Sequence, residues 1–212
     1  VATNRAEFAR ALGGATPVFL KQVHGTRVVR LTAADVKAAD APPHEADASL
    51  TTEPGIACTV QVADCLPVLL AAPAGRGVAA AHAGWRGLAG GVVDASVAAL
   101  CEAAGCAPAE LVAWLGPCIG PRQFEVGAEV VEAFGGDARD PHRFVPSPKT
   151  HADGRPRWLA NLPQLARERL AALGVTRVSG GAWCTVEDAS RFFSFRRDGV
   201  TGRLAAAVWL RG

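Results

Sequence analysis

The chain has 212 residues, of which 50% are hydrophobic and 20% charged, with a formal net charge of +2. This composition excludes a disordered chain and fits one domain over residues 1–212 with a substantial core. No apolar run of about 18 residues predicts a membrane span, and no dense basic block suggests a nucleic-acid partner. The N-terminal segment is charged throughout and lacks the apolar core of a secretory signal, so we expect a cytoplasmic protein.

The first third of the chain predicts one helix and a set of strands. Residues 4–12 are amphipathic and end at paired glycines, which is typical of a short helix. Residues 17–25 are expected to form a strand, whereas residues 33–54 are interpreted as a loop rich in Ala, Pro, Asp and Thr. Residues 56–62 alternate between apolar and small or polar side chains, the period-2 pattern of a strand, and a second apolar run follows at 66–72.

The remaining segments continue to intermingle strands and helices. Strands are predicted over 77–84, 110–117, 175–184 and 204–210, and helices over 88–103, 123–136 and 161–174. The last helix has the clearest signals, because Asn161 can cap it and Gly174 can end it. The polar, Pro-rich residues 135–157 are expected to form a surface loop. Without strict βαβ alternation, the pattern favours an α/β (α+β) fold with mixed rather than all-parallel sheets.

The six cysteines include no C-x-x-C pair, which argues against a zinc ribbon or a thioredoxin-like motif. Without an export signal and in a chain of this size, reduced thiols are expected rather than a disulfide framework. Cys58 and Cys101 lie inside apolar segments and are interpreted as buried thiols.

Three chemically distinctive residues fall where apolar runs end, namely His24, Cys65 and His82. Two imidazoles and a thiolate are ligands that zinc prefers, and three protein ligands with one open position define a catalytic zinc site. Their separations of about 40 and 17 residues match no local metal motif. From the residues alone, core histidines beside a buried thiol therefore remain an alternative. A further alternative is a thiolate–imidazolium pair of Cys65 and His82, oriented by Asp64, as in cysteine hydrolases.

The stretch "GWRGLAGG" places Gly84 and Arg86 at the start of a predicted helix. Free backbone N–H groups and a guanidinium at such a position could hold an anion. The stretch matches neither G-x-G-x-x-G nor a P-loop, and its glycines also fit close packing of a helix on a strand.

Seven sequence blocks follow one another in an order and spacing that carry a family resemblance. They are KQVHG, ADASLTT, VADCLPVLL, AAAHAGWRG, LGPCIGP, FEVG and CTVEDASRFFSFRRDGVTGRLAAAVWL. Together they resemble the multicopper polyphenol oxidoreductase (laccase-domain) family, the peptidoglycan-editing-factor group now described as purine nucleoside phosphorylases. The resemblance covers nearly the whole chain and implies a four-layer α/β/β/α sandwich, with two packed sheets between outer helices.

The resemblance also implies a zinc site formed by His24 of QVHG, Cys65 of ADC and His82 of HAGWRG. The implied activities are phosphorolysis of adenosine, inosine, guanosine and methylthioadenosine, together with adenosine deamination. Zinc would lower the pKa of a water for attack on the purine C6. Phosphorolysis would need phosphate held beside the ribose C1′ while positive charge develops there. The expected partners are these small molecules, and the chain is expected to be a monomer or a homodimer.

Roles for further residues are hypotheses that follow from the resemblance. Arg86 is predicted to hold phosphate, and Asp64 to orient the second histidine ligand or shuttle a proton. Gln22, Gly84 and Arg196 are predicted to contact substrate. For Asp64, a turn residue at a strand end is the alternative.

Other functions remain open at this stage. A copper-dependent polyphenol oxidase would also use two histidines and a cysteine, but the sequence has no methionine for an axial ligand. A cysteine hydrolase acting on peptidoglycan precursors would use the Cys65 sulfur as a nucleophile instead of a ligand. Family members usually carry an additional N-terminal stretch of TTR-x-G-G type, which we expect this domain to lack. A binding protein that merely retains zinc is therefore a further alternative.

Overall fold

The computed structural model describes residues 2–37, 42–149 and 152–212. Within these residues a three-stranded sheet has the order β1-β4-β12, a six-stranded sheet the order β11-β7-β5-β6-β3-β2, and a small sheet the order β8-β10-β9. Parallel and antiparallel pairs occur in both larger sheets, so the predicted mixed α/β fold is confirmed. No helix in the described part of the chain is long and apolar enough to cross a membrane.

The bounds of the elements follow the chain. The strands are β1 (Thr16–Val18), β2 (Val28–Arg30), β3 (Ala48–Thr51), β4 (Ile56–Val62), β5 (Leu66–Ala71), β6 (Val78–Ala83), β7 (Val112–Leu115), β8 (Glu125–Val126), β9 (Phe144–Pro146), β10 (Trp158–Ala160), β11 (Arg177–Gly180) and β12 (Leu204–Trp209). The helices are α1 (Ala2–Ala11), α2 (Ala33–Lys37), α3 (Trp85–Gly90), α4 (Val92–Ala104), α5 (Ala128–Ala133), α6 (Leu162–Ala172) and α7 (Phe195–Asp198), with 3-10 turns η1 (Pro73–Gly75) and η2 (Pro108–Glu110).

The layers of the fold are set by the two faces of β4. Ile56, Cys58 and Val60 contribute to a buried core between the two larger sheets. Ala57 points the opposite way and joins a separate cluster with Phe8 of α1. The period-2 pattern of the sequence thus marks a strand that is covered on both faces, by the second sheet and by a helix.

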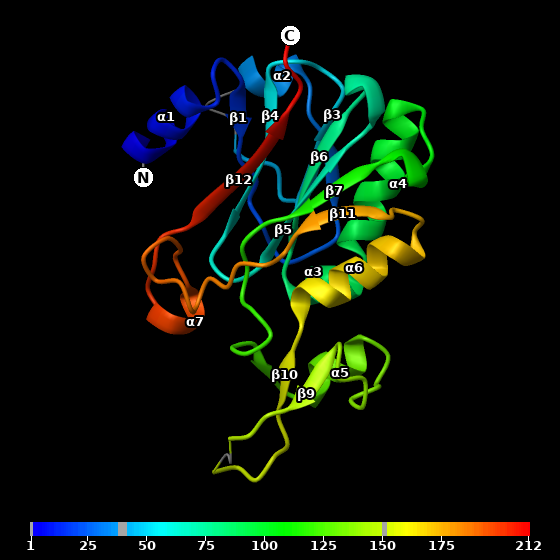
Figure 1. Cartoon of the computed structure of the whole chain (residues 1–212). Coiled ribbons are helices and arrows are strands. Elements are labelled where there is room, and N and C mark those ends of the chain that lie inside the picture. Colours follow the sequence, from blue (N-terminus) through cyan, green and yellow to red (C-terminus); the bar gives the residue numbers. More distant parts are fainter. Residues whose placement is uncertain (1, 38–41, 150–151) are drawn as a thin grey trace.

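The six-stranded sheet is the centre of the larger core. Its far face is covered by α3, α4 and α6, while the three-stranded sheet and α1 lie on its other side (Figure 1). All six residues of β6 are buried, as expected for a central strand packed on both faces. The small sheet and α5 project from one end of this sandwich (Figure 1).

Three predicted elements differ in detail. The predicted loop 33–54 contains α2 and the fully buried strand β3, which pairs with β6, although residues 38–41 of that loop lie outside the described part. The predicted helix 88–103 is two helices, because Gly91 adopts φ +101° between α3 and α4. In the predicted helix 123–136, two residues pair as β8 before α5 begins.

Two further segments also depart from the sequence pattern. The predicted strand 17–25 forms a strand only over β1, followed by one isolated bridge from Lys21 to Glu45 before the chain turns at His24. The predicted loop 135–157 includes β9, which pairs with β10, and its residues 150–151 lie outside the described part.

The helix layer should be stabilised chiefly by its buried leucines. Leu100 of α4 is fully buried, so Leu100→Ala should lower the free energy of unfolding by about 2–5 kcal/mol. Val200 is 97% exposed, and Val200→Ala should change the free energy of unfolding by less than about 0.5 kcal/mol. Urea unfolding monitored by circular dichroism measures both values, and equal effects would contradict the assigned core.

Candidate functional site

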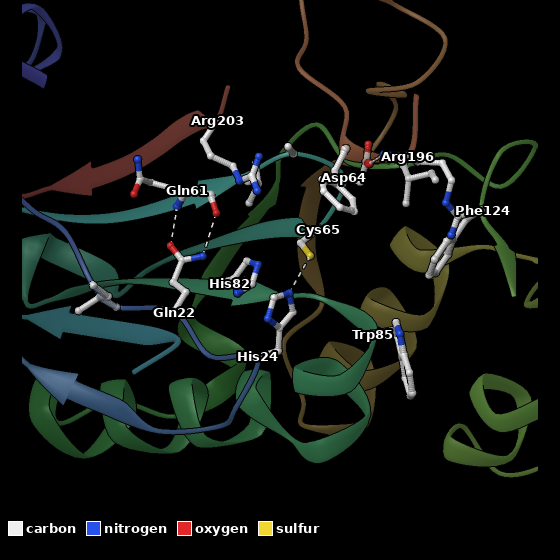
Figure 2. Close-up of a pocket in the computed structure, with 15 residues that line it drawn as sticks. Gln22, His24, Gln61, Asp64, Cys65, His82, Trp85, Phe124, Arg196 and Arg203 are labelled. Atoms are coloured by element: carbon white, nitrogen blue, oxygen red, sulfur yellow. Dashed lines mark hydrogen bonds between the residues drawn. The ribbon is translucent and has the colours of Figure 1, made fainter. Parts of the chain in front are cut away.

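Three side chains that are distant in sequence meet at one end of the packed sheets (Figure 2). His24 follows β1, Cys65 lies in the turn from β4 to β5, and His82 lies near the end of β6. Their potential ligand atoms are all within 4.8 Å of one another. Cys65 Sγ is 3.7 Å from His24 Nε2, and the two imidazole rings meet edge to face with centroids 4.8 Å apart.

Backbone strain is concentrated beside this cluster. His24 and Asp64 have φ values of +62° and +103°, in the region that non-glycine residues rarely adopt. Such a conformation costs about 1–3 kcal/mol and persists only where its surroundings hold it. At His24 the carboxylate of Asp47 does so, because it accepts hydrogen bonds from three consecutive backbone N–H groups, those of Val23, His24 and Gly25.

The same carboxylate contacts the second histidine. Asp47 Oδ1 lies 2.8 Å from His82 Nδ1, and both side chains are almost completely buried. Asp47 rather than Asp64 thus contacts His82, which corrects the hypothesis that Asp64 orients this histidine. Asp47 itself was missed because it lies in the segment interpreted as a loop. An aspartate among small apolar residues in the ADASL stretch is the signal that could have found it.

Asp64 instead joins the β4–β5 turn to the C-terminal part of the chain. Its Oδ1 accepts a hydrogen bond from Thr185 Oγ1 at 2.6 Å, and its Oδ2 accepts one from the backbone N–H of Arg196 at 2.7 Å. Its backbone carbonyl accepts a third from the Ile119 N–H at 2.9 Å. The turn that carries Cys65 is therefore fixed from two directions.

The cluster favours a thiolate beside a charged imidazole. Burial opposes ionisation of Cys65, but hydrogen bonds and charge interactions with His24 and His82 outweigh it and lower the pKa of the thiol to about 7. Burial likewise disfavours the imidazolium of His82, yet its contacts with Asp47 and Cys65 raise its pKa to about 9. Burial also works against ionisation of Asp47, but hydrogen bonds from His82 and the turn keep the pKa of this carboxyl below its usual range.

The donor set fits a metal ion of the zinc type. Two imidazoles and one thiolate are preferred zinc ligands, and three protein ligands leave one coordination position for substrate or solvent. The backbone also fits closely, because a Cβ added to Gly84 would lie 2.9 Å from Cys65 Sγ and 3.0 Å from His24 Cδ2. Gly84, which is predicted to contact substrate, therefore lies against Cys65 and His24, where only glycine leaves these side chains room.

A cavity of about 590 Å³ opens onto the three side chains, within the range of small-molecule sites. It is lined by Leu20, Gln22, His24, Gln61, Val62, Ala63, Asp64, Cys65, His82, Trp85, Ile119, Phe124, Phe195, Arg196 and Arg203. Asp64 is the one carboxylate in this set, against two guanidinium groups. The lining thus combines aromatic surfaces with an excess of positive charge.

The amide of Gln22 is already bonded within the cavity wall. Its Nε2 donates to the Gln61 carbonyl at 2.8 Å and its Oε1 accepts from the Gln61 N–H at 2.7 Å (Figure 2). Gln22, which the resemblance predicts to contact substrate, lines the cavity, and its polar atoms continue the hydrogen bonding of β4.

The arginines of the predicted site separate into two groups. Arg196 lines the cavity, with its Nη1 donating to the Glu125 carbonyl at 3.1 Å and its guanidinium 5.7 Å from the Phe124 ring centroid. Arg86 is exposed and stacks on Trp85 at 4.4 Å, without lining the cavity. Arg203 lines the cavity and was missed, because in the sequence it is one arginine of a basic segment.

The reactivity of Cys65 should reveal this arrangement. In metal-free protein half of the Cys65 side chains should be thiolate at about pH 7, instead of at pH 9.0 as for an ordinary thiol. The rate at which iodoacetamide alkylates Cys65 should therefore have its midpoint near pH 7 and fall at lower pH. Burial and the Cys106 thiol raise the pKa of Cys101 to about 11, so this residue should react far more slowly. Peptide mass spectrometry measures both, with Cys65→Ser as control. A Cys65 midpoint near 9 would contradict the pairing with histidines.

Comparisons with known proteins identify the family of this chain. The family model of the multi-copper polyphenol oxidoreductase laccases matches residues 1–211. The purine nucleoside phosphorylase YfiH of Escherichia coli is 47% identical over 195 residues, which are 92% of this chain and 74% of that protein. A purine nucleoside phosphorylase of Pseudomonas aeruginosa is 48% identical over 196 residues, with the same shares covered.

Solved structures show the same fold. A crystal structure of a Neisseria meningitidis protein of the family model DUF152 superposes with a TM-score of 0.82 at 42% identity, covering 99% of this chain and 80% of that one. YlmD from Geobacillus stearothermophilus gives a TM-score of 0.84 at 30% identity, covering 99% and 79%. This chain therefore belongs to the multi-copper polyphenol oxidoreductase laccase family.

Proposed function

We propose that this chain is a zinc-dependent purine nucleoside phosphorylase, acting on adenosine, inosine, guanosine and methylthioadenosine. The observation that carries the proposal is the convergence of His24, Cys65 and His82 at the floor of a cavity that also holds arginines and aromatic rings. Relatives named purine nucleoside phosphorylase, at 47–48% identity over 92% of this chain, support the same reaction class.

A zinc ion held by the three side chains would supply Lewis-acid chemistry at the one position that they leave open. The thiolate of Cys65 and the uncharged form of His82 are the states that ligate, so occupation of the site would release protons. The turn at His24 and the turn at Asp64 hold two of the donors in place beforehand. That preorganisation limits the cost of assembling the site.

The guanidinium groups of Arg196 and Arg203 are proposed to hold phosphate. In phosphorolysis a phosphate oxygen forms a bond to the ribose C1′ while the bond from C1′ to the purine nitrogen breaks and its electron pair leaves with the base. Positive charge develops on the ribose, so a phosphate kept close to C1′ by arginines stabilises the transition state. Arg203 takes over the role that the sequence suggested for Arg86, because Arg203 lines the cavity.

The purine is proposed to stack on the aromatic lining. Trp85, Phe124 and Phe195 border the cavity, and flat rings of this kind bind a base face without reading its edge. Stacking of this kind is consistent with a site that accepts several purine nucleosides. Asp64 has both carboxylate oxygens bonded to the protein, so we propose that it positions the Cys65 turn, with any proton transfer through it requiring one of those bonds to open.

Adenosine deamination is proposed as a side activity of the same site, since a zinc centre next to a purine cavity suits attack of water at C6. Copper-dependent phenol oxidation, which the family description suggests, is less well supported. The sequence has no methionine for an axial ligand, and the cluster holds two of its five histidines, too few for a trinuclear centre. We expect a cytoplasmic monomer or homodimer with small-molecule partners.

The central prediction is a metal-dependent release of base. Purified protein should contain close to one zinc per chain and release hypoxanthine from inosine only when phosphate is present. His82→Ala and Cys65→Ala should each lower the metal content and reduce base release at least about 100-fold. His44→Ala alters an exposed histidine paired with Asp35 and should have no effect.

The same assays distinguish the alternatives. Base release at the wild-type rate in both ligand variants would overturn the proposal. Bound copper with oxidation of phenols and no base release would favour the oxidase. Hydrolysis of a peptidoglycan precursor by metal-free protein, lost in Cys65→Ser, would favour the cysteine hydrolase. Ammonia release from adenosine reports the deaminase activity separately.

The role of the arginines is tested by the dependence on phosphate. Arg203→Gln should raise the KM for phosphate about tenfold or more and leave the KM for inosine less affected, since one charge-assisted contact to the anion is removed. Arg177→Gln, an exposed change on β11, is the matched control. If Arg86→Gln raised the KM for phosphate and Arg203→Gln left it unchanged, the phosphate site would instead lie at the start of α3.

A further inference from the structure

The buried carboxylate of Asp47 binds parts of two different metal-ligand residues. Its Oδ1 accepts from the His24 backbone N–H at 2.8 Å and faces His82 Nδ1 at 2.8 Å. Its Oδ2 accepts from the N–H groups of Val23 at 3.1 Å and Gly25 at 2.7 Å. The Asp47 side chain is completely buried, so these contacts are shielded from water.

The chemistry of a carboxylate determines which nitrogen of His82 carries the proton. An ionised carboxylate only accepts hydrogen bonds, so Nδ1 must donate and therefore keeps its hydrogen. The lone pair of the neutral ring is then on Nε2, the nitrogen left to face Cys65 and His24. A metal ligand must present such a lone pair, and a hydrogen bond at the other nitrogen is what sets the tautomer.

We infer that Asp47 is the positioning residue of the metal centre, fixing His82 as the tautomer that ligates through Nε2 and fixing the strained turn that presents His24. This inference rests on the metal site of the proposed function, but it does not depend on which reaction the site performs. Two of the three donors are then controlled by one side chain that touches neither substrate nor metal.

The neutral isostere of Asp47 shows why the carboxylate is required. In Asp47→Asn one oxygen becomes an NH₂ group, which can only donate. If that group faces Val23 and Gly25, two backbone donors lose their acceptor and the His24 turn is weakened. If it faces His24 and His82, then Nδ1 of His82 must accept, and the ring proton moves to Nε2 where it blocks the metal. Either arrangement weakens metal binding.

The first experiment measures zinc affinity, without substrate, by competition with a chromophoric chelator at pH 7.5. Asp47→Asn should raise the dissociation constant about 10–100-fold. Asp35→Asn is the matched control, because Asp35 Oδ1 also faces a histidine nitrogen, His44 Nε2 at 2.6 Å, away from the cavity. It should leave the affinity unchanged. A twofold or smaller change in folded Asp47→Asn would overturn the inference.

The second experiment uses wild-type protein and therefore does not depend on how the variant folds. With ¹¹³Cd in place of zinc and ¹⁵N-labelled histidine, His82 should show coupling from cadmium to Nε2 and a slowly exchanging proton on Nδ1. Coupling to Nδ1, or an Nδ1 without a proton, would overturn the inference. If these signatures are found but inosine is not cleaved, the proposed reaction fails while the role of Asp47 stands.

Discussion

The face-to-face packing of two sheets is the constraint on which the site depends. β4 belongs to one sheet and β5 to the other, so the chain must cross between layers within the short turn that holds Asp64 and Cys65. His82 comes from β6, which is buried at every position in the middle of the six-stranded sheet. Cys65 directly precedes β5, whose Pro67 pairs with His82 of β6, so the end of the crossing turn places Cys65 beside His82.

Stability and chemistry are therefore linked at this edge of the fold. The left-handed backbone at two positions, the buried Asp47 carboxylate and the thiolate of Cys65 would each be unfavourable alone. They are tolerated because they stabilise one another. The Asp47 carboxylate holds the His24 turn and the His82 imidazole, and the two imidazoles stabilise the Cys65 thiolate. Such mutual compensation is typical of sites where strain and buried charge serve a function.

Local pattern singled out the three clustered residues but not the residues that support them. His24, Cys65 and His82 stand at ends of apolar runs, and alternation marked β4 correctly, because both signals are contained in neighbouring residues. Asp47 acts on residues 22 to 35 positions away, so no local spacing shows it. The short Ala- and Ser-containing strand β3 has too little apolar periodicity to be separated from a loop, and its existence depends on pairing with β6. Likewise, the place of Arg203 in the cavity is fixed by how the C-terminal segment returns to β4.

The reciprocal amide pairing of Gln22 with Gln61 has a consequence for how the molecule avoids association. β1 pairs with β4 only as far as Cys58, and beyond that the border of the three-stranded sheet would offer unbonded peptide groups. A single glutamine side chain imitates the missing backbone at Gln61. An unprotected border of this kind recruits strands from other molecules. The mouth of the cavity can thus stay open to small solutes without becoming a template for aggregation.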